Sequence, residues 1–326
     1  MQKSESIRAG TIVLELCNLH LKYQMEQEEL KAKSIDRREC TIEKHIGDYT
    51  LGRMQIQSVK VADVDNHVTT LIRAGKLSAS SIEKVVDVLN AAFIWAIIRG
   101  ELEFNPVAPI KPTLVKRIQK IKQRSANDAD VDVLSEDEQK RFDEEALKID
   151  ERTGTLKYTS GLYGLLLLYT GMRCGEMLAL RWEDVDFQGG FLIIEKSRSM
   201  AKNRNKKDEY ENSYIMVEGT TKNEKARKIK LTDEALDILR QIKKCAGLSD
   251  VEEFVVRTRT GRPNTATNLE HRMATIFKNA GMAELKGGLH IFRRTCIAYA
   301  STRIKNGIKN RLNCEFICSI WFCKMI

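Results

Sequence analysis

Three of the four prolines in this 326-residue chain fall within residues 106–112, in the sequence PVAPIKP. A proline has no backbone N–H to donate, and it disfavours the helical conformation of the residue before it. A helix therefore cannot continue through this segment, and an extended connection is expected. A chain of this length can also form two domains, each with its own core. The sequence predicts a domain boundary here, with a first domain over residues 1–112.

The first domain is predicted to be helical. Between residues 7 and 104, apolar side chains recur at the spacing that places them on one face of a helix. Examples are Ile12, Leu16, Leu19, Ile82, Val85, Val86, Leu89, Ala92, Phe93, Ala96 and Ile97.

Basic side chains dominate the segment that follows the prolines. Six of them occur without an acidic residue among them: Lys111, Lys116, Arg117, Lys120, Lys122 and Arg124. Such a row suits a linker that lies along a phosphate backbone. A solvated tether between two domains is the alternative, because runs of charge are usually solvated. We predict a basic and polar linker over residues 113–131, with these six side chains as DNA-binding residues.

The second domain is predicted over residues 132–326, with mixed secondary structure. Ser135 followed by Glu138 has the S-x-x-E form of a capping box, which marks the start of a helix. Three short β-rich runs follow later and are typical of a small antiparallel sheet. They are residues 191–195, 214–218 and 227–231. The hydrophilic insertion between the first two runs, residues 196–213, is predicted to be a disordered solvated loop; a mobile basic loop that samples DNA is the alternative.

Charge and composition narrow the class of protein. Lysine and arginine number 54 against 45 acidic residues, a formal net charge of +9, which favours a polyanionic partner such as DNA. No run of about 18 apolar residues is present, as a membrane-spanning helix would need, so no membrane association and a cytoplasmic location are expected. The eight cysteines are scattered without a C-x-x-C pair. We therefore expect reduced thiols, no metal site and no cofactor.

Two motifs carry basic residues suited to phosphate chemistry. Arg173 lies in the sequence GMRCGEMLALRWEDVDF, and His290 and Arg293 form an H-x-x-R motif 120 residues further on. Together, and in this order around the β-rich runs, they resemble the tyrosine recombinase, or phage integrase, family of site-specific recombinases. The resemblance implies a mainly α fold with a small antiparallel β-sheet, in which a helical core-type DNA-binding domain precedes an α+β catalytic domain. It also implies DNA integration for a phage or transposon, by strand cleavage and rejoining through a 3′-phosphotyrosine.

The resemblance assigns a role to each matching residue. Arg173 and Arg293 would clamp the phosphate, because two guanidinium groups can hydrogen-bond its developing negative charge. Lys222, in the turn between the second and third β-rich runs, would protonate the leaving 5′ oxygen, although Lys225 and Lys228 compete with it by position. His290 would help to position the phosphate and move protons, and Glu176 would brace Arg173 from behind.

The sequence departs from the family after Arg293. Family members carry a second His or Trp and then the nucleophilic tyrosine, roughly 35 residues after the H-x-x-R histidine. Here Tyr299 is the last tyrosine; on a helix it would lie roughly 120° around and about 9 Å along from Arg293, so it is expected to be a packed aromatic. Trp321 is also interpreted as a packed or exposed aromatic. No nucleophile is found.

The amino-acid composition also changes abruptly after about residue 309, where the sequence is NRLNCEFICSIWFCKMI. A frameshift or truncation that replaced the final helices would explain it, and a divergent folded end is the alternative. The catalytic domain is therefore expected to be truncated and defective in cleavage.

Three hypotheses for function follow. The first is a tyrosine recombinase that acts on double-stranded DNA, self-associates there as a tetramer with accessory DNA-bending proteins, and is nucleoid-associated in a bacterium. The second is a non-catalytic DNA-binding module that occupies a recombination site, with tyrosine supplied by another protomer as a variant. The third is an unrelated basic helical protein, such as a helix-turn-helix regulator.

Overall fold

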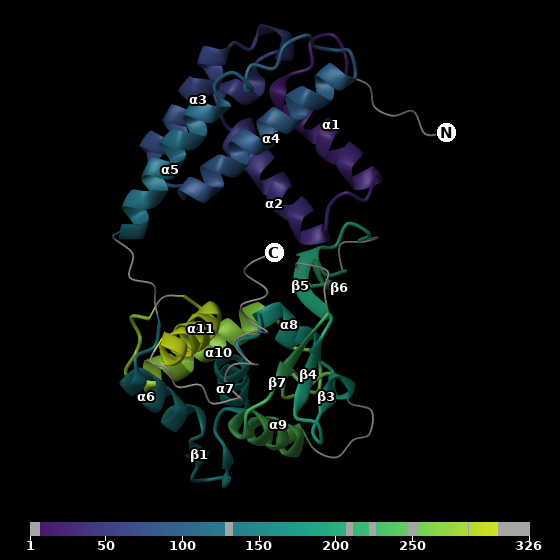
Figure 1. The fold of residues 1–326 in the computed structure, drawn as a ribbon. Helices are drawn as coiled ribbons and strands as arrows, with labels where there is room; N and C mark the ends of the chain where they lie inside the picture. The colour runs from purple at the N-terminus through teal and green to yellow at the C-terminus, as the bar shows by residue number, and fades with distance from the viewer. Residues whose placement is uncertain are drawn as a thin grey trace. The chain divides into compact units, whose positions relative to one another are not determined.

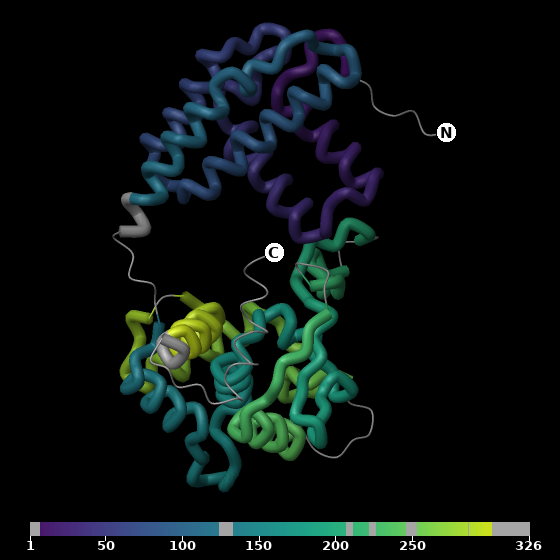
Figure 2. The backbone as a smooth tube through the Cα atoms, in the orientation of Figure 1, coloured from purple at the N-terminus to yellow at the C-terminus, as the bar shows by residue number. Residues whose placement is uncertain are grey.

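The computed structural model describes residues 7–127, 133–206, 211–221, 226–246, 253–285 and 287–305. Lys222, Trp321 and the segment after residue 309 lie outside these residues. The chain divides into two compact units (Figures 1 and 2). Unit 1 comprises residues 1–130 and 201–207, and unit 2 comprises residues 131–200 and 208–326.

Unit 1 is helical, as the apolar spacing predicts. Its long helices are α1 (Val13–Glu26), α2 (Ala32–Ile42), α3 (Val61–Ala74), α4 (Ala79–Ile98) and α5 (Lys111–Asn127), with the short helical turns η1 (Glu43–Gly47), η2 (Thr50–Arg53) and η3 (Ile56–Ser58) between α2 and α3. Helix α4 contacts α1, α2, α3 and α5. It contributes Val85, Leu89 and Phe93, which are fully buried, to the core of the unit.

The basic segment is a helix of unit 1, which differs from the predicted linker over residues 113–131. Pro112 stands in the first turn of α5, where a helix has no partner for the missing N–H in any case. Leu114 and Ile118 are buried in the core of unit 1 and hold α5 against α4. The prolines therefore start a helix here, and apolar side chains between the basic ones decide where it packs.

Unit 2 is built around a buried helix. Helix α7 (Thr159–Thr170) contacts α6 (Glu136–Ala146), α9 (Asp233–Ala246), α10 (Ala266–Asn279) and α11 (His290–Lys305). Its run of four leucines, residues 165–168, is buried. The predicted capping box at the start of α6 is confirmed, because the Ser135 backbone N–H donates to Glu138 Oε2 at 2.8 Å and Ser135 Oγ accepts from the Glu138 N–H at 3.3 Å.

The sheets of unit 2 are small and antiparallel. Strands β3 (Val185–Asp186), β4 (Phe191–Ile194) and β7 (Arg227–Lys230) form one sheet in the order β3-β4-β7. Strand β6 (Tyr214–Thr220) pairs instead with β5 (Lys196–Lys202), and β1 (Ile149–Asp150) pairs with β2 (Thr155–Leu156). The three predicted runs are strands, and the predicted mainly α fold with a small antiparallel sheet is confirmed.

The predicted loop over residues 196–213 is wrong in its first part. Residues 196–202 form strand β5, because the backbone of this polar segment finds hydrogen-bonding partners in β6. The basic side chains that follow are also engaged. Arg204 pairs with Asp36 at 2.6 Å and with Glu39 at 3.0 Å within unit 1.

Candidate active site

The site begins at the turn between α7 and α8 (Cys174–Ala179). Gly171 ends α7 with a φ of +59°, a left-handed conformation that favours glycine, and its N–H donates to the Leu167 carbonyl at 2.9 Å. Met172 is fully buried and anchors the turn. Arg173 follows as the residue that caps the start of α8. The sequence Thr-Gly-Met-Arg thus forms the short turn between the two helices, and it places Arg173 next to the C-terminal end of α7.

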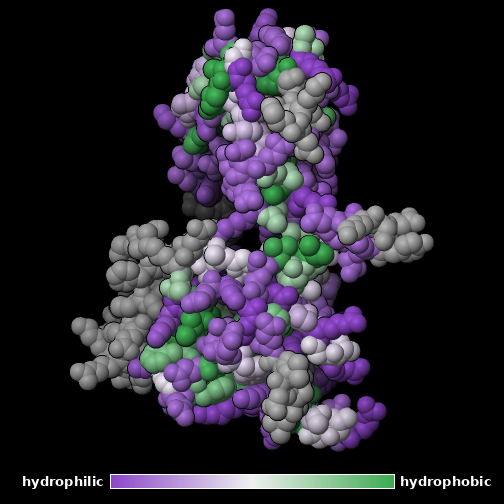
Figure 3. All heavy atoms as spheres, turned by 90° about the vertical axis from the view of Figure 1, so that its right-hand side faces the viewer, coloured by the Kyte–Doolittle hydropathy of each residue, from purple (hydrophilic) through white to green (hydrophobic). Residues whose placement is uncertain are grey.

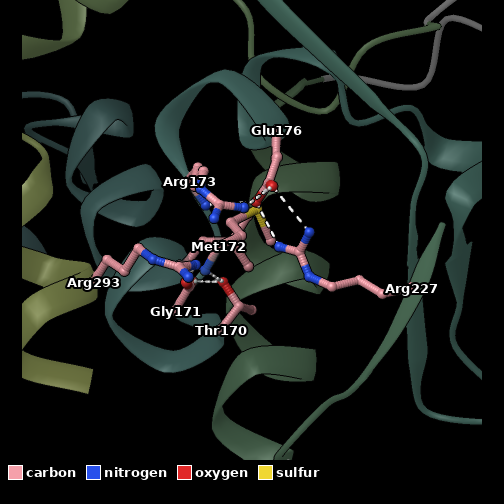
Figure 4. A network of polar contacts seen from close by, with 8 residues as sticks. Thr170, Gly171, Met172, Arg173, Glu176, Arg227 and Arg293 are labelled. Carbon is pink, nitrogen blue, oxygen red and sulfur yellow. Dashed lines mark hydrogen bonds and ion pairs between the residues drawn. The ribbon is translucent and has the colours of Figure 1, made fainter. Parts of the chain in front are cut away.

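Glu176 is the buried centre of the site. Only 2% of the residue is exposed, yet both of its carboxylate oxygens are engaged (Figure 4). Oε2 accepts the Arg173 backbone N–H at 2.7 Å, and Oε1 accepts Arg173 Nη1 at 2.9 Å. Arg227 donates from Nη1 to Oε1 at 2.9 Å and from Nη2 to Oε2 at 2.5 Å. The carboxylate therefore ties two arginines together.

These contacts keep Glu176 ionised. Burial raises the pKa of the carboxyl, but the hydrogen bond and charge of Arg227, followed by the backbone and side-chain hydrogen bonds of Arg173, outweigh it and hold the pKa below its ordinary value.

Arg293 enters the same site from α11. It is half-buried, and its Nη1 donates to the Gly171 carbonyl at the end of α7 (Figure 4). Burial lowers the pKa of its guanidinium, and the charge of Arg173 lowers it further. Three guanidinium groups with a single carboxylate among them leave two positive charges uncompensated. An arrangement of this kind stabilises an oxyanion.

The structure brings together Arg173, Glu176 and Arg293 and adds Arg227, which the sequence analysis did not single out. Its signal lies in the alternation of β7, where Ile229 is buried and Arg227, two residues earlier, shares that face of the strand. A charged residue at an inward-facing position of a strand must have a partner.

Two other residues considered in the sequence analysis, His290 and Tyr299, lie elsewhere on α11. His290 is the first residue of α11, one turn before Arg293, and its side chain is exposed. Tyr299 is half-buried further along α11; burial raises the pKa of its hydroxyl, and the charge of Glu136 in α6 raises it further, while a hydrogen bond with Gln139 lowers it. Its neighbours are thus residues of α6, which supports the interpretation of a packed aromatic.

The six predicted DNA-binding residues lie on or at the start of α5. Lys116, Lys120 and Lys122 are exposed. Lys111 pairs with Asp87 at 2.8 Å and Arg117 with Asp65 at 3.1 Å, so part of their charge is neutralised within unit 1. The side chain of Arg124 lies outside the described structure. Hydrophilic side chains cover much of unit 1 on the face shown in Figure 3.

A second ionic network in unit 2 was also missed. Arg181 pairs with Glu253 at 2.5 Å and, through Nη2, with both oxygens of Glu218 at 3.0 Å. Arg198 lies over the ring of Phe254 at 4.3 Å. Since Glu218 is in β6 and Arg198 in β5, this network fastens the hairpin to the segment after α8. Like the Glu176 cluster, this network pairs arginines with carboxylates from different segments of unit 2.

The described residues contain no group of His, Cys, Asp and Glu that could hold a metal ion. Among the same residues, none of the helices combines the length and apolar character needed to cross a membrane.

Comparison with known proteins identifies the family that this site defines. A model of the phage integrase family matches residues 132–309, which is more than half of the chain. The chain therefore belongs to the phage integrase family.

Two curated relatives are similar to parts of the chain. A XerC-like tyrosine recombinase of Caldanaerobacter subterraneus subsp. tengcongensis is 27% identical over 294 residues, which cover 84% of this chain and 69% of that protein. The ICEBs1 integrase of Bacillus subtilis is 30% identical over 145 residues, 44% of this chain and 34% of the relative.

Solved structures share the fold. The Tn1549 transposon integrase in complex with circular intermediate DNA matches with a TM-score of 0.66 at 19% identity, covering 93% of this chain and 90% of the other. A lambda integrase tetramer bound to a Holliday junction matches with a TM-score of 0.61 at 17% identity, covering 90% and 74%. The present chain therefore shares its fold with these integrases.

Proposed function

We propose that this chain takes part in site-specific recombination of a mobile element, and that its arginine cluster binds the phosphodiester at which a DNA strand is cut and rejoined. The observation that carries the proposal is the convergence of Arg173 and Arg293 around the end of α7, with Glu176 behind Arg173. Both residues are held by hydrogen bonds and are partly exposed, so their guanidinium groups can hydrogen-bond the non-bridging oxygens of a phosphodiester. Because guanidinium groups remain charged at all ordinary pH values, they act without a metal ion.

The proposed chemistry follows the family. A tyrosine hydroxyl gives its proton to His290 as it attacks the phosphorus, the bond from phosphorus to the 5′ oxygen breaks, that oxygen leaves with a proton from Lys222, and a 3′-phosphotyrosine forms. Arg173 and Arg293 stabilise the extra negative charge of the pentavalent transition state. His290, one turn before Arg293, is exposed and can exchange protons with a group bound there. The roles of Lys222 and His290 rest on the resemblance and belong to the proposal.

Among the described residues, none of the hydrogen bonds of the arginine cluster is made with a tyrosine. Tyr299 is the last tyrosine of the sequence, and its surroundings are residues of α6. We therefore expect the chain by itself to hold and orient the phosphodiester without cutting it, unless a tyrosine comes from another protomer. This supports the second candidate function, a DNA-binding module that occupies a recombination site, for which the exposed lysines of α5 would supply further phosphate contacts.

The wider setting is part of the same proposal. Double-stranded DNA is the partner, and lambda integrase is a tetramer on its Holliday junction, which supports self-association of this chain on DNA. Accessory DNA-bending proteins and a cytoplasmic, nucleoid-associated location complete the expectation.

Binding to short DNA duplexes of random sequence, followed by fluorescence anisotropy over a series of salt concentrations, tests the proposal. The full chain should bind, and Arg173→Gln and Arg293→Gln should each weaken binding about tenfold, the loss expected for one charge-assisted hydrogen-bonded contact. Lys148→Gln serves as the control, since Lys148 pairs with Glu145 on α6. Unchanged binding in both arginine variants would refute the proposed clamp.

A denaturing gel separates the two candidate functions. A protein–DNA complex that survives sodium dodecyl sulfate is covalent and would establish strand cleavage. Salt-sensitive binding with no such complex would favour the DNA-binding module.

A further inference from the structure

We infer that Arg227 is a positioning residue of this site, which holds Glu176 and through it fixes the guanidinium of Arg173 for phosphate binding. The inference rests on the proposed function, because it concerns the same phosphate clamp. It adds a residue that none of the sequence motifs contains.

Arg227 and Arg173 grip the same carboxylate in different ways. Arg227 contacts both oxygens of Glu176 with two guanidinium nitrogens, which is the forked geometry that fixes a carboxylate in its plane. The side chain of Arg173 contacts only Oε1. The side chain of Arg173 is 30% exposed, whereas that of Arg227 is 14% exposed. Arg173 is thus the more open of the two, and Arg227 supports the carboxylate from the interior (Figure 4).

The backbone around Arg227 makes it a fixed support. Arg227 begins β7 and is the antiparallel partner of Ile194 in β4. Ile229, two residues on, is buried in the core of unit 2. A side chain on a paired strand is held more firmly than one on a loop. The Arg227–Glu176 pair therefore fastens α8, and the arginine at its start, to the sheet.

Arg227 also lies close in the sequence to Lys222. Lys222, the proposed general acid, precedes it by five residues in the connection between β6 and β7. The strand that follows the lysine is therefore the strand that carries the support of the clamp.

The electrostatic balance supports a role beyond packing. The charge and hydrogen bonds of Arg227 are the strongest influences that lower the pKa of the Glu176 carboxyl. An ionised Glu176 can hold Arg173 by its backbone N–H and its Nη1 together. Without Arg227, one buried carboxylate would face a single arginine, and Arg173 would be free to turn its guanidinium inward.

A double-mutant cycle on DNA binding of the full chain tests the inference. The probe is the pool of random-sequence duplexes, and the variants are Arg227→Gln, Arg173→Gln and the pair together. Arg173→Gln should weaken binding about tenfold and lower the slope of log affinity against log salt by about 1, the signature of one lost phosphate contact. Arg227→Gln should cause a similar loss in the native background and no further loss when Arg173 is already absent.

Lys228→Gln is the matched control, since it removes one positive charge from the next residue of β7, whose side chain is exposed. Its effect should be equal in the two backgrounds. Arg227→Lys keeps the charge but not the fork, so it should restore only part of the affinity. Circular dichroism and thermal melting establish that each variant is folded at the assay temperature; if Arg227→Gln unfolds, Arg227→Lys takes its place in the cycle.

The outcomes distinguish the two proposals. Equal losses from the Arg227 variant in both backgrounds would overturn the positioning role and leave a general charge effect. No loss from Arg173→Gln would instead overturn the proposed clamp itself.

Discussion

The two units of this protein treat buried charge in opposite ways. The core of unit 1 is apolar, and the histidines that it buries, His20 and His67, are kept neutral by burial. Unit 2 buries Glu176 in its ionised form and surrounds it with arginines. Because an ion in the interior is stabilising only when it is fully paired, a fold gains little stability from such a cluster. Among the described residues such a cluster occurs in unit 2, which supports the proposal that unit 2 binds the phosphodiester.

The ion pairs of the two units also differ in how far their side chains are exposed to water. In unit 1 the pair of Arg117 and Asp65 has side chains that are 36% and 38% exposed, so water screens it. In unit 2 the side chain of Glu176 is 1% exposed, and the arginine beside it opens toward solvent. A charge network that is buried at one end and open at the other can receive an anion.

The largest expected effects on stability come from substitutions that disrupt one core at a time. Phe93→Ala in unit 1 and Phe292→Ala in unit 2 each remove a fully buried ring, and each should lower the free energy of unfolding of its own unit by about 3–5 kcal/mol. The two side chains belong to separate cores. Hydrogen exchange measured by peptide in each unit, at increasing denaturant, reports the two stabilities.

In each variant the other unit should keep its protection. Ile94→Ala, at an exposed position of α4, is the control and should change stability by less than about 1 kcal/mol. Equal loss of protection in both units would show that they unfold as one.

Removal of the central carboxylate should have the next largest effect. Glu176→Gln leaves Arg173 and Arg227 without a counter-charge in a buried place, and we expect unit 2 to lose about 3 kcal/mol. Asp65→Asn in unit 1 breaks a half-exposed pair and should cost less than about 1 kcal/mol. The same peptide-resolved exchange experiment compares them, and similar losses would remove the contrast between the units.

Much of this site could be predicted from the sequence, and the reason for the rest is geometric. Arg173, Glu176 and Arg293 stand in short motifs whose spacing is fixed by one helical turn. Arg227 stands alone in a strand, 51 residues from Glu176 in α8, and only the tertiary fold brings the two together. The contact therefore depends on tertiary structure, and the sequence indicates only that Arg227 lies on the inward face of β7 and needs a partner.

The fold shows the same division. The capping box of Ser135 and the apolar face of α4 are local, and the structure follows them. Within the predicted linker, helix α5 packs on unit 1 because Leu114 and Ile118 are buried in its core, a feature that the many charges around them obscure in the sequence. Strand β5 was missed because a polar edge segment becomes a strand only when β6 supplies its hydrogen bonds.

Acid should weaken unit 1. Burial lowers the pKa of both His20 and His67 to about 4. The unfolded chain binds their protons near pH 6.5, so stability is full above that pH and is lost as the pH falls towards 4. We expect each histidine to contribute a loss of about 2 kcal/mol to unit 1 between pH 7 and pH 5. Peptide-resolved exchange at a series of pH values measures it, and His67→Phe should reduce the slope.

Unit 2 contains a carboxyl with the opposite dependence. Burial, followed by the charge of Glu144, raises the pKa of Asp143 to about 6. Its folded form keeps a proton that the unfolded chain has lost, so its contribution is full below about pH 4 and disappears as the pH rises through 6. Asp143→Asn should therefore stabilise unit 2 at pH 7 by about 1 kcal/mol, after allowance for screening, and leave it unchanged at pH 4. Equal effects at both pH values would contradict this assignment.

The smallest effects are expected from single lysines of α5, and they extend the comparison to DNA binding. Lys116 and Lys120 are exposed and, being four residues apart, lie on one face of the helix. If they contact phosphates, Lys116→Gln and Lys120→Gln should each lower the slope of log affinity against log salt by about 1. Arg117→Gln should change it less, because Arg117 already pairs with Asp65 and donates to Thr69. Since these contacts would be screened surface contacts and those of Arg173 partly buried ones, added salt should reduce the lysine contribution first. A larger effect from Arg117 than from either lysine would show that its ion pair opens on DNA.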